Sequence, residues 1–126
     1  MASATINFEA SDLAARVEQC SQFELDNLPF GVILLDREGA VLFYSEAEAR
    51  LSGVGEPPLG QNLFAISACL GSDDFRGRLQ RAIEAGPLDL ELAWPGDYAD
   101  PTRQLRIRVQ SSRNGGMWLF IERDTP

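Results

Sequence analysis

The fold is decided by residues 28–48, which read Leu-Pro-Phe-Gly-Val-Ile-Leu-Leu-Asp-Arg-Glu-Gly-Ala-Val-Leu-Phe-Tyr-Ser-Glu-Ala-Glu. The apolar run at 31–36 predicts a buried strand, and residues 40–44 predict a second strand that returns beside it. A tight turn is expected between them, because Gly39 can adopt the positive φ that such turns need. The stretch therefore predicts a β-hairpin, followed by a short helical turn that begins at Ser45 and ends near Gly53.

Before the hairpin, the chain predicts a loose leader at residues 1–10 and two short helices. Ser11 is expected to cap the first helix, which places three apolar side chains on one face, Leu13, Val17 and Cys20. The second is expected at 23–28, because Pro29 disfavours helix in the residue before it. We interpret residues 1–28 as an N-terminal helical cap and 29–126 as the core of the same single domain.

After the hairpin, residues 54–72 contain several prolines and glycines and are expected to be irregular. Ser72 predicts the start of a longer helix that ends at Gly86. Alternating apolar and polar residues then predict three strands, at 88–94, 105–109 and 117–123. Trp94, Trp118 and Phe120 are expected in the core, and Arg106 and Arg108 on a solvated strand face. The order predicts an α+β fold, with a five-stranded antiparallel sheet and helices packed on one face.

The composition excludes several classes of function. The 126 residues include no His, and all basic residues are Arg, so His-based catalysis, a Walker A lysine and a lysine Schiff base are excluded. The net charge of −8 disfavours nucleic acid and anionic membranes as partners. No signal peptide or long apolar run is present, which favours a cytoplasmic protein with two free thiols. A non-enzymatic role is expected.

The order of the elements is similar to that of a PAS domain, which is a sensory fold. Three segments resemble the photoactive yellow protein family more closely: the hairpin at 28–48, the segment Ala68-Cys-Leu-Gly-Ser-Asp-Asp-Phe-Arg-Gly-Arg-Leu79, and the closing strand Trp118-Leu-Phe-Ile-Glu-Arg123. The resemblance covers residues 11–123. It implies a PAS fold with an N-terminal helical cap and a blue-light receptor that carries p-coumaric acid (4-hydroxycinnamic acid).

The resemblance also implies the residues of the chromophore site. Cys69 would carry the chromophore as a thioester, and Tyr44 and a protonated Glu48 would hold its phenolate oxygen. Ser52 would support Tyr44, and the other chromophore-binding residues would be Val32, Phe64, Ala68, Trp94 and Tyr98. Val54 stands where the family often has an arginine that shields the chromophore ring. Trans–cis isomerisation would move a proton from Glu48 and loosen the cap.

Other interpretations of these residues remain open. Ser45-Glu-Ala-Glu48 also matches a capping box, in which Glu48 bonds back to the Ser45 N–H. Cys69 can be an ordinary loop cysteine, in which case the chain is a PAS ligand-sensing or protein-interaction module without a covalent chromophore. A cysteine enzyme would need a carboxylate such as Asp73 as its base. We expect a downstream signalling protein as partner and a monomer or weak dimer.

Overall fold

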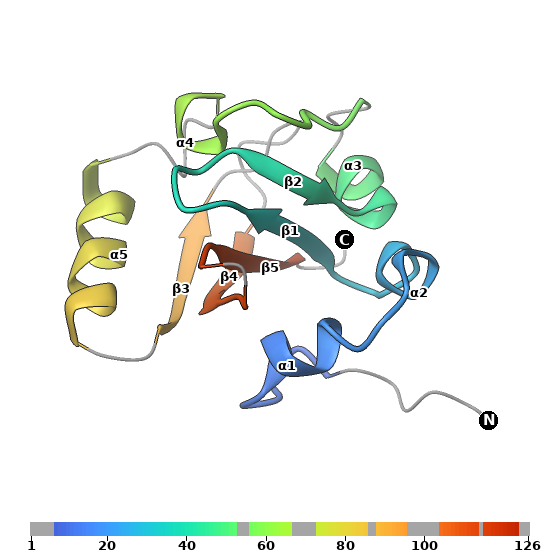
Figure 1. Cartoon of the computed structure of the whole chain (residues 1–126), viewed down its shortest axis with the longest axis horizontal. Helices are drawn as coiled ribbons and strands as arrows, with labels where there is room; N and C mark the ends of the chain where they lie inside the picture. The colour runs from blue at the N-terminus through green and yellow to red at the C-terminus, as the bar shows by residue number, and fades with distance from the viewer. Residues whose placement is uncertain are drawn as a thin grey trace.

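The computed structural model describes residues 7–52, 56–66, 73–85, 88–95, 104–113 and 115–123 (Figure 1). Its elements are, in chain order, α1 (Leu13–Val17), α2 (Gln22–Asp26), β1 (Gly31–Leu35), β2 (Val41–Tyr44), α3 (Glu46–Ser52), α4 (Leu63–Ile66), α5 (Asp73–Ala85), β3 (Asp89–Pro95), β4 (Gln104–Ser111) and β5 (Met117–Arg123). The strands form one antiparallel sheet in the order β2-β1-β5-β4-β3. The predicted α+β fold with a five-stranded antiparallel sheet is confirmed.

The hairpin of β1 and β2 forms where the sequence predicts it. Gly39 has a φ of 94°, as the turn requires. Asp36 adds a restraint, because its Oδ1 accepts the backbone N–H groups of Glu38 and Ala40, each at 2.9 Å. The pairing shifts register between Leu34 and Leu35. The hairpin thus places Tyr44 at the end of β2, directly before α3.

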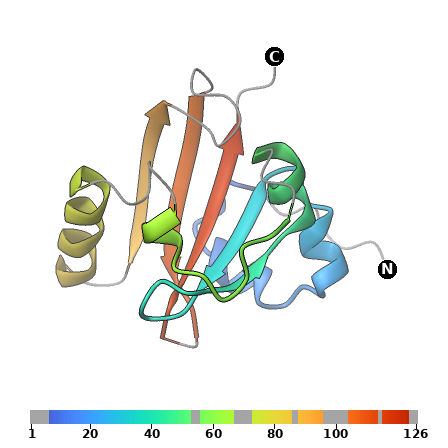
Figure 2. The same ribbon diagram turned by 90° about the horizontal axis from the view of Figure 1, so that it is seen from above.

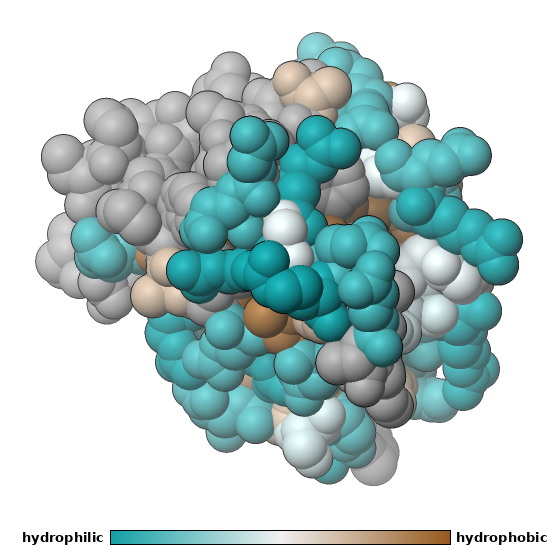
Figure 3. All heavy atoms as spheres, turned by 90° about the vertical axis from the view of Figure 1, so that its left-hand side faces the viewer, coloured by the Kyte–Doolittle hydropathy of each residue, from teal (hydrophilic) through white to brown (hydrophobic). Residues whose placement is uncertain are grey.

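One face of the sheet carries the main apolar core, which we call the core cluster. It contains Ile33, Leu35, Val41, Leu63, Phe75, Leu79, Leu88, Leu105, Ile107, Val109, Met117, Leu119 and Ile121. Helix α5 contributes Phe75 and Leu79 at helical spacing and lies at one end of the sheet (Figure 2). The side of the molecule that carries α5 exposes mainly hydrophilic side chains (Figure 3), as expected for an amphipathic helix.

The opposite face carries a second group of buried residues, which we call the cap cluster. It contains Phe8, Leu13, Ala14, Val17, Leu25, Phe30, Val32, Trp118 and Phe120. Phe8 is buried and its ring meets that of Phe30 edge-on at 5.5 Å, so the prediction of a loose leader is wrong for this residue. Trp118 and Phe120 are core residues as predicted, and they share the cap cluster with residues of α1 and α2. Both helices lie on one side of the sheet (Figure 1).

Polar side chains of β4 attach the N-terminal segment to the sheet. Arg108 donates to the carbonyl oxygens of Phe8 and Ala10, at 2.7 and 2.8 Å. Gln110 accepts from the N–H of Ala14 at 2.7 Å and donates to the Ser11 carbonyl at 3.1 Å. Arg108 is only 5% exposed, so the prediction that it faces solvent is wrong. A strand pattern cannot reveal that a distant segment covers the polar face.

Arg106 forms a more exposed set of contacts on the same face. Its guanidinium pairs with Glu9, Glu91 and Glu122 at 2.6, 2.7 and 2.9 Å, and it lies 5.0 Å from the centre of the Phe8 ring. Its side chain is 39% exposed, so each pair is expected to contribute at most about 1 kcal/mol. These contacts join the N-terminal segment to β3, β4 and β5.

The helix ends differ from prediction at three places. Ser11 does not cap α1: the N-cap residue is Asp12, whose side chain caps no backbone N–H and pairs with Arg16 instead. Helix α2 is shorter than predicted and begins with a capping box between Ser21 and Glu24. The segment 54–72 contains α4, whose first turn Asn62 caps by accepting the Ala65 N–H at 3.2 Å. At α2 and α4, polar side chains at the helix start decide where the helix begins.

Acid is expected to loosen the cap. The pKa of Glu9 lies below its ordinary value of 4.5 because Arg106 donates to it, and Arg16 lowers the pKa of Asp12 below 3.8. A carboxylate with a depressed folded-state pKa stabilises the fold above its unfolded-state pKa, and this stabilisation disappears as the pH falls through the folded value. Hydrogen exchange of the α1 amides should therefore accelerate as the pH falls below about 4.5, after correction for intrinsic exchange.

Two variants test this prediction. Glu9→Gln should reduce the acid response, because the titrating group is gone. Glu56→Gln removes an exposed glutamate outside the cap and should leave the response unchanged. If hydrogen exchange of the α1 amides accelerates equally with acid in the wild type and in Glu9→Gln, the assignment of this response to Glu9 is contradicted.

Candidate functional site

Ser45 joins the start of α3 to β1. Its Oγ accepts the backbone N–H groups of Val32 and Glu48, each at 3.1 Å, and its own N–H donates to the Val32 carbonyl at 2.9 Å. Ser45 is completely buried. Half of the predicted capping box is therefore present: the hydroxyl caps the helix, but the Glu48 side chain does not return to the Ser45 N–H. The serine fixes the first turn of α3 and directs Glu48 elsewhere.

The Glu48 carboxylate forms a buried ion pair with Arg123 at the end of β5. Two N–H groups of the guanidinium donate to the two carboxylate oxygens, each at 2.7 Å. The side chains of Arg123 and Glu48 are 4% and 3% exposed. Gly31 makes room for the pair, because a Cβ at this position would overlap Glu48 Oε1. A glycine in β1 is thus required by the close approach of this carboxylate.

The geometry of the pair shows the charge of Glu48. Arginine stays protonated and can only donate, so a carboxyl group that faces both of its terminal nitrogens is an ionised acceptor. The bidentate pairing with Arg123 therefore favours an ionised Glu48 in this structure. The protonated Glu48 that is expected beside a bound chromophore stays a prediction.

Tyr44 lies on the same side of the sheet as the ion pair. It is the register partner of Ile33 and packs against the core cluster. On β5, Ile121 lies opposite Gly31 and Leu119 lies opposite Ile33. Side chains of a strand alternate between its two faces, so Arg123, two residues after Ile121, lies on the same face. Tyr44, Glu48 and Arg123 thus come from β2, α3 and β5 to one face of the sheet.

Val32 lies on the other face. Its side chain is fully buried in the cap cluster, while the neighbouring Ile33 belongs to the core cluster. Successive side chains of a strand point to opposite faces, so Val32 and Tyr44 cannot line one pocket. The prediction for Val32 is wrong, and Ile33 is the β1 residue on the Tyr44 face.

The remaining predicted site residues are not tested by the structure. Three lie outside the described residues: Cys69, Ala68 and Tyr98. The backbones of Ser52, Phe64 and Trp94 are in α3, α4 and β3, but their side chains are outside the description. Attachment at Cys69 and the contacts of these side chains therefore stay predictions.

Cys20 is a poor candidate for attachment. It follows α1, is half-buried against the cap cluster, and its Sγ lies 3.5 Å from the Arg16 carbonyl. Burial and the nearby charge of Glu24 raise the pKa of its thiol, which lowers the fraction of reactive thiolate. An open hollow of about 330 Å³ beside it is lined by Leu34 and Trp118 among others. This hollow lies on the cap face, away from Tyr44.

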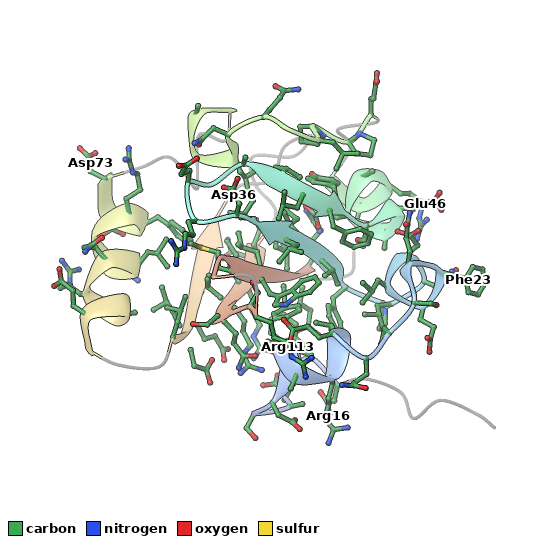
Figure 4. All side chains as sticks on the ribbon, viewed as in Figure 1. Arg16, Phe23, Asp36, Glu46, Asp73 and Arg113 are labelled. Carbon is green, nitrogen blue, oxygen red and sulfur yellow. The ribbon has the colours of Figure 1, made fainter. Side chains whose placement is uncertain are left out.

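Sequence reasoning missed Arg123 and Ser45 as site residues. A signal for Arg123 was present, because Met117, Leu119 and Ile121 alternate along β5 and the same period carries Arg123 to the core face. Nothing local in the sequence pairs it with Glu48. Glu46, by contrast, is exposed and points outward from α3 (Figure 4).

The structure is similar to solved domains of a sensory class. It matches the photoactive yellow protein domain of a sensor histidine kinase from Rhodospirillum centenum with a TM-score of 0.69 and 28% identity, covering 85% of this chain and 96% of that domain. It matches a PAS domain from Colwellia psychrerythraea with a TM-score of 0.62 and 12% identity, covering 90% of this chain and 98% of that one. The second likeness concerns the fold alone.

Curated proteins give a more specific result. Photoactive yellow protein of Cereibacter sphaeroides is 30% identical over 124 residues, covering 94% of this chain and 97% of its own length. Photoactive yellow protein of Rhodothalassium salexigens is 27% identical over 121 residues, with the same coverage of both chains. A scan of protein-family models finds no match.

The sheet, its helices and the similar structures define a PAS domain, a class of sensory modules rather than enzymes. The chain belongs to the photoactive yellow protein family. Membership in this family implies a chromophore. Within the described residues, none of the helices has the length and apolar character needed to span a membrane.

Proposed function

We propose that the chain is a blue-light receptor that carries 4-hydroxycinnamic acid as a thioester on Cys69. The observation that carries this proposal is the buried ion pair of Glu48 and Arg123, with the partly buried Tyr44 on the same face of the sheet, in a member of this family. An acid with a phenol at its far end needs polar partners inside the protein, because burying an unpaired phenolate is costly. The proposal makes Cys69 a point of attachment and not a catalytic nucleophile.

The donors and acceptors of the site suit a phenolic group. Arg123 supplies N–H donors and a positive charge, Tyr44 supplies an O–H group, and Glu48 supplies a carboxyl that can accept or, once protonated, donate. Their position against the apolar core cluster favours strong hydrogen bonds. The bound group would supply isomerisation of its double bond on absorbing light, and the side chains would hold its phenolic oxygen.

The chemistry of attachment favours Cys69 over Cys20. A thioester forms when a thiolate attacks an activated carbonyl and displaces its leaving group. The raised pKa of the Cys20 thiol keeps it mostly protonated at neutral pH. The resemblance of residues 68–79 to the chromophore-bearing loop of the family supports the same choice.

The signal would pass from Glu48 to the N-terminal cap. Proton exchange at the Glu48 carboxyl oxygens changes the charge beside the first turn of α3. Ser45 accepts the Glu48 N–H in this turn and is joined to the Val32 backbone by two hydrogen bonds. The Val32 side chain lies in the cap cluster. A shift of this turn would therefore reach the cap through the Val32 backbone and loosen it. The proposed receiver is a cytoplasmic signalling protein that distinguishes the docked cap from the loosened cap.

The test is the mass of the purified protein after treatment with an activated derivative of 4-hydroxycinnamic acid. We expect the mass of one thioester-linked group to be gained by the wild type and by Cys20→Ala, and to be absent from Cys69→Ala. Peptide mapping should place the modification on Cys69. A folded wild type that gains no mass, or gains it only at Cys20, would contradict the proposal and favour a PAS interaction module without pigment.

A further inference from the structure

The ion pair of Glu48 and Arg123 is the charged group of the core face. Among the described residues, Arg123 is the one charged residue at the core-face positions of β1, β4 and β5. Tyr44 on β2 is the other titratable group packed there. Charges on neighbouring helices lie elsewhere: Glu46, Arg50 and the charged residues of α5 are exposed, and Asp26 of α2 accepts the Glu46 N–H.

Counting only the part of the chain that the structure describes, the pair balances the charge on this face. A bound phenol, with an ordinary pKa of about 10, would add a second acidic group beside one cation. Two anions and one cation would leave a buried negative charge without compensation, which is strongly unfavourable. The arrangement with a balanced charge keeps one proton on the two acids together, and Arg123 compensates whichever of them is the anion.

We propose that Arg123 is the counter-cation of the chromophore site and fixes the number of protons that Glu48 and the chromophore phenol share at one. The inference rests on the proposed function and extends it with a positioning residue on β5. The proposal is supported by the bidentate pairing of Arg123 with Glu48 at 2.7 Å, in which both side chains are nearly inaccessible to solvent. Without the cation, the remaining anion is uncompensated and the site takes up a second proton.

The first test titrates the visible absorption of protein loaded with 4-hydroxycinnamic acid. In Arg123→Gln, the pH at which the phenolate band disappears should rise by about 1–3 units, because a neighbouring opposite charge lowers an acid's pKa by that amount. Arg123→Lys keeps the charge and should lie within about one unit of the wild type. Arg106→Gln removes a cation from the opposite face and should leave the titration unchanged.

The second test needs no chromophore. Infrared spectra of the unloaded protein at neutral pH should lack a protonated carboxyl band assignable to Glu48 in the wild type and should show it in Arg123→Gln. Glu48→Gln assigns the band by removing it. If Arg123→Gln does not fold, the wild-type infrared spectrum still reports the charge of Glu48. The Arg123→Lys titration then tests whether a positive charge at this position is sufficient.

Three results would overturn the proposal: a protonated Glu48 in the unloaded wild type, an unchanged titration in a folded, loaded Arg123→Gln, or an equally large shift in Arg123→Lys. The last would show that shape and not charge matters. Failure of the proposed function is distinguishable, because it appears as absent mass gain at Cys69 while the infrared spectra still report the charge of Glu48.

Discussion

Replacing Arg123 with methionine is expected to lower the free energy of unfolding of the unloaded protein by about 3–5 kcal/mol, because breaking a buried ion pair leaves one charge without its partner. The group left behind is Glu48, which is 3% exposed and lies against Gly31. At neutral pH this carboxyl must take up a proton, and that uptake costs free energy in place of the buried charge. Domains of this size have a total stability of about 5–15 kcal/mol, so the loss is a large part of the whole. Urea unfolding at neutral pH measures it.

A double-mutant cycle separates the pair from its surroundings. Glu48→Gln alone leaves the guanidinium unpaired and should also destabilise the protein, whereas the double variant Glu48→Gln/Arg123→Met should lose much less than the sum of the two changes. Arg50→Met removes an exposed arginine of α3 and should stay within about 0.5 kcal/mol of the wild type. Additive losses in the cycle would contradict a direct interaction between Glu48 and Arg123.

The second large effect is expected at Arg108. Arg108→Met would leave the buried carbonyl group of Phe8 and the part-buried carbonyl group of Ala10 without the donor they have in the structure. An unsatisfied buried group costs about 1–3 kcal/mol, and the part-buried group costs less, so we expect a loss of about 2–4 kcal/mol. Within the described residues, the Nε of Arg108 is buried without a partner, and its removal offsets part of that loss.

The loss at Arg108 should be concentrated in the cap. We expect hydrogen exchange to accelerate in residues 8–17 of Arg108→Met by more than it does in β5, because the cap can detach while the sheet stays folded. Arg106→Met is the matched control: it removes a half-exposed arginine of the same strand, and its solvent-exposed ion pairs predict a smaller loss than that of Arg108→Met. Uniform acceleration across the sheet in Arg108→Met would contradict a local role.

The sheet was predictable from sequence because strand signals are local. Alternation in β3, β4 and β5 and the turn at Gly39 each follow from neighbouring residues. Helix α5 was predicted for the same reason, from its apolar spacing and acidic first turn. Boundaries were less certain where a side chain decided them, as Asn62 does at the start of α4.

The candidate site was predictable only in part. Tyr44 and Glu48 come to the core face from adjacent elements, and the sequence places both near one end of the hairpin. The partner of Glu48 lies 75 residues away, and no local pattern connects the two. The same limit explains Arg108, whose burial depends on residues about 100 positions earlier in the chain. Val32 was assigned to the wrong face because a shift of one residue reverses the direction of a strand side chain.

The most direct test of the central claim is absorption of the loaded protein before, during and after blue illumination. The account predicts a visible band in the wild type that bleaches in light and returns in darkness, with no band in Cys69→Ala treated in the same way. A wild type that carries the chromophore on Cys69, by mass, but shows no reversible change under illumination would contradict a light-receptor function.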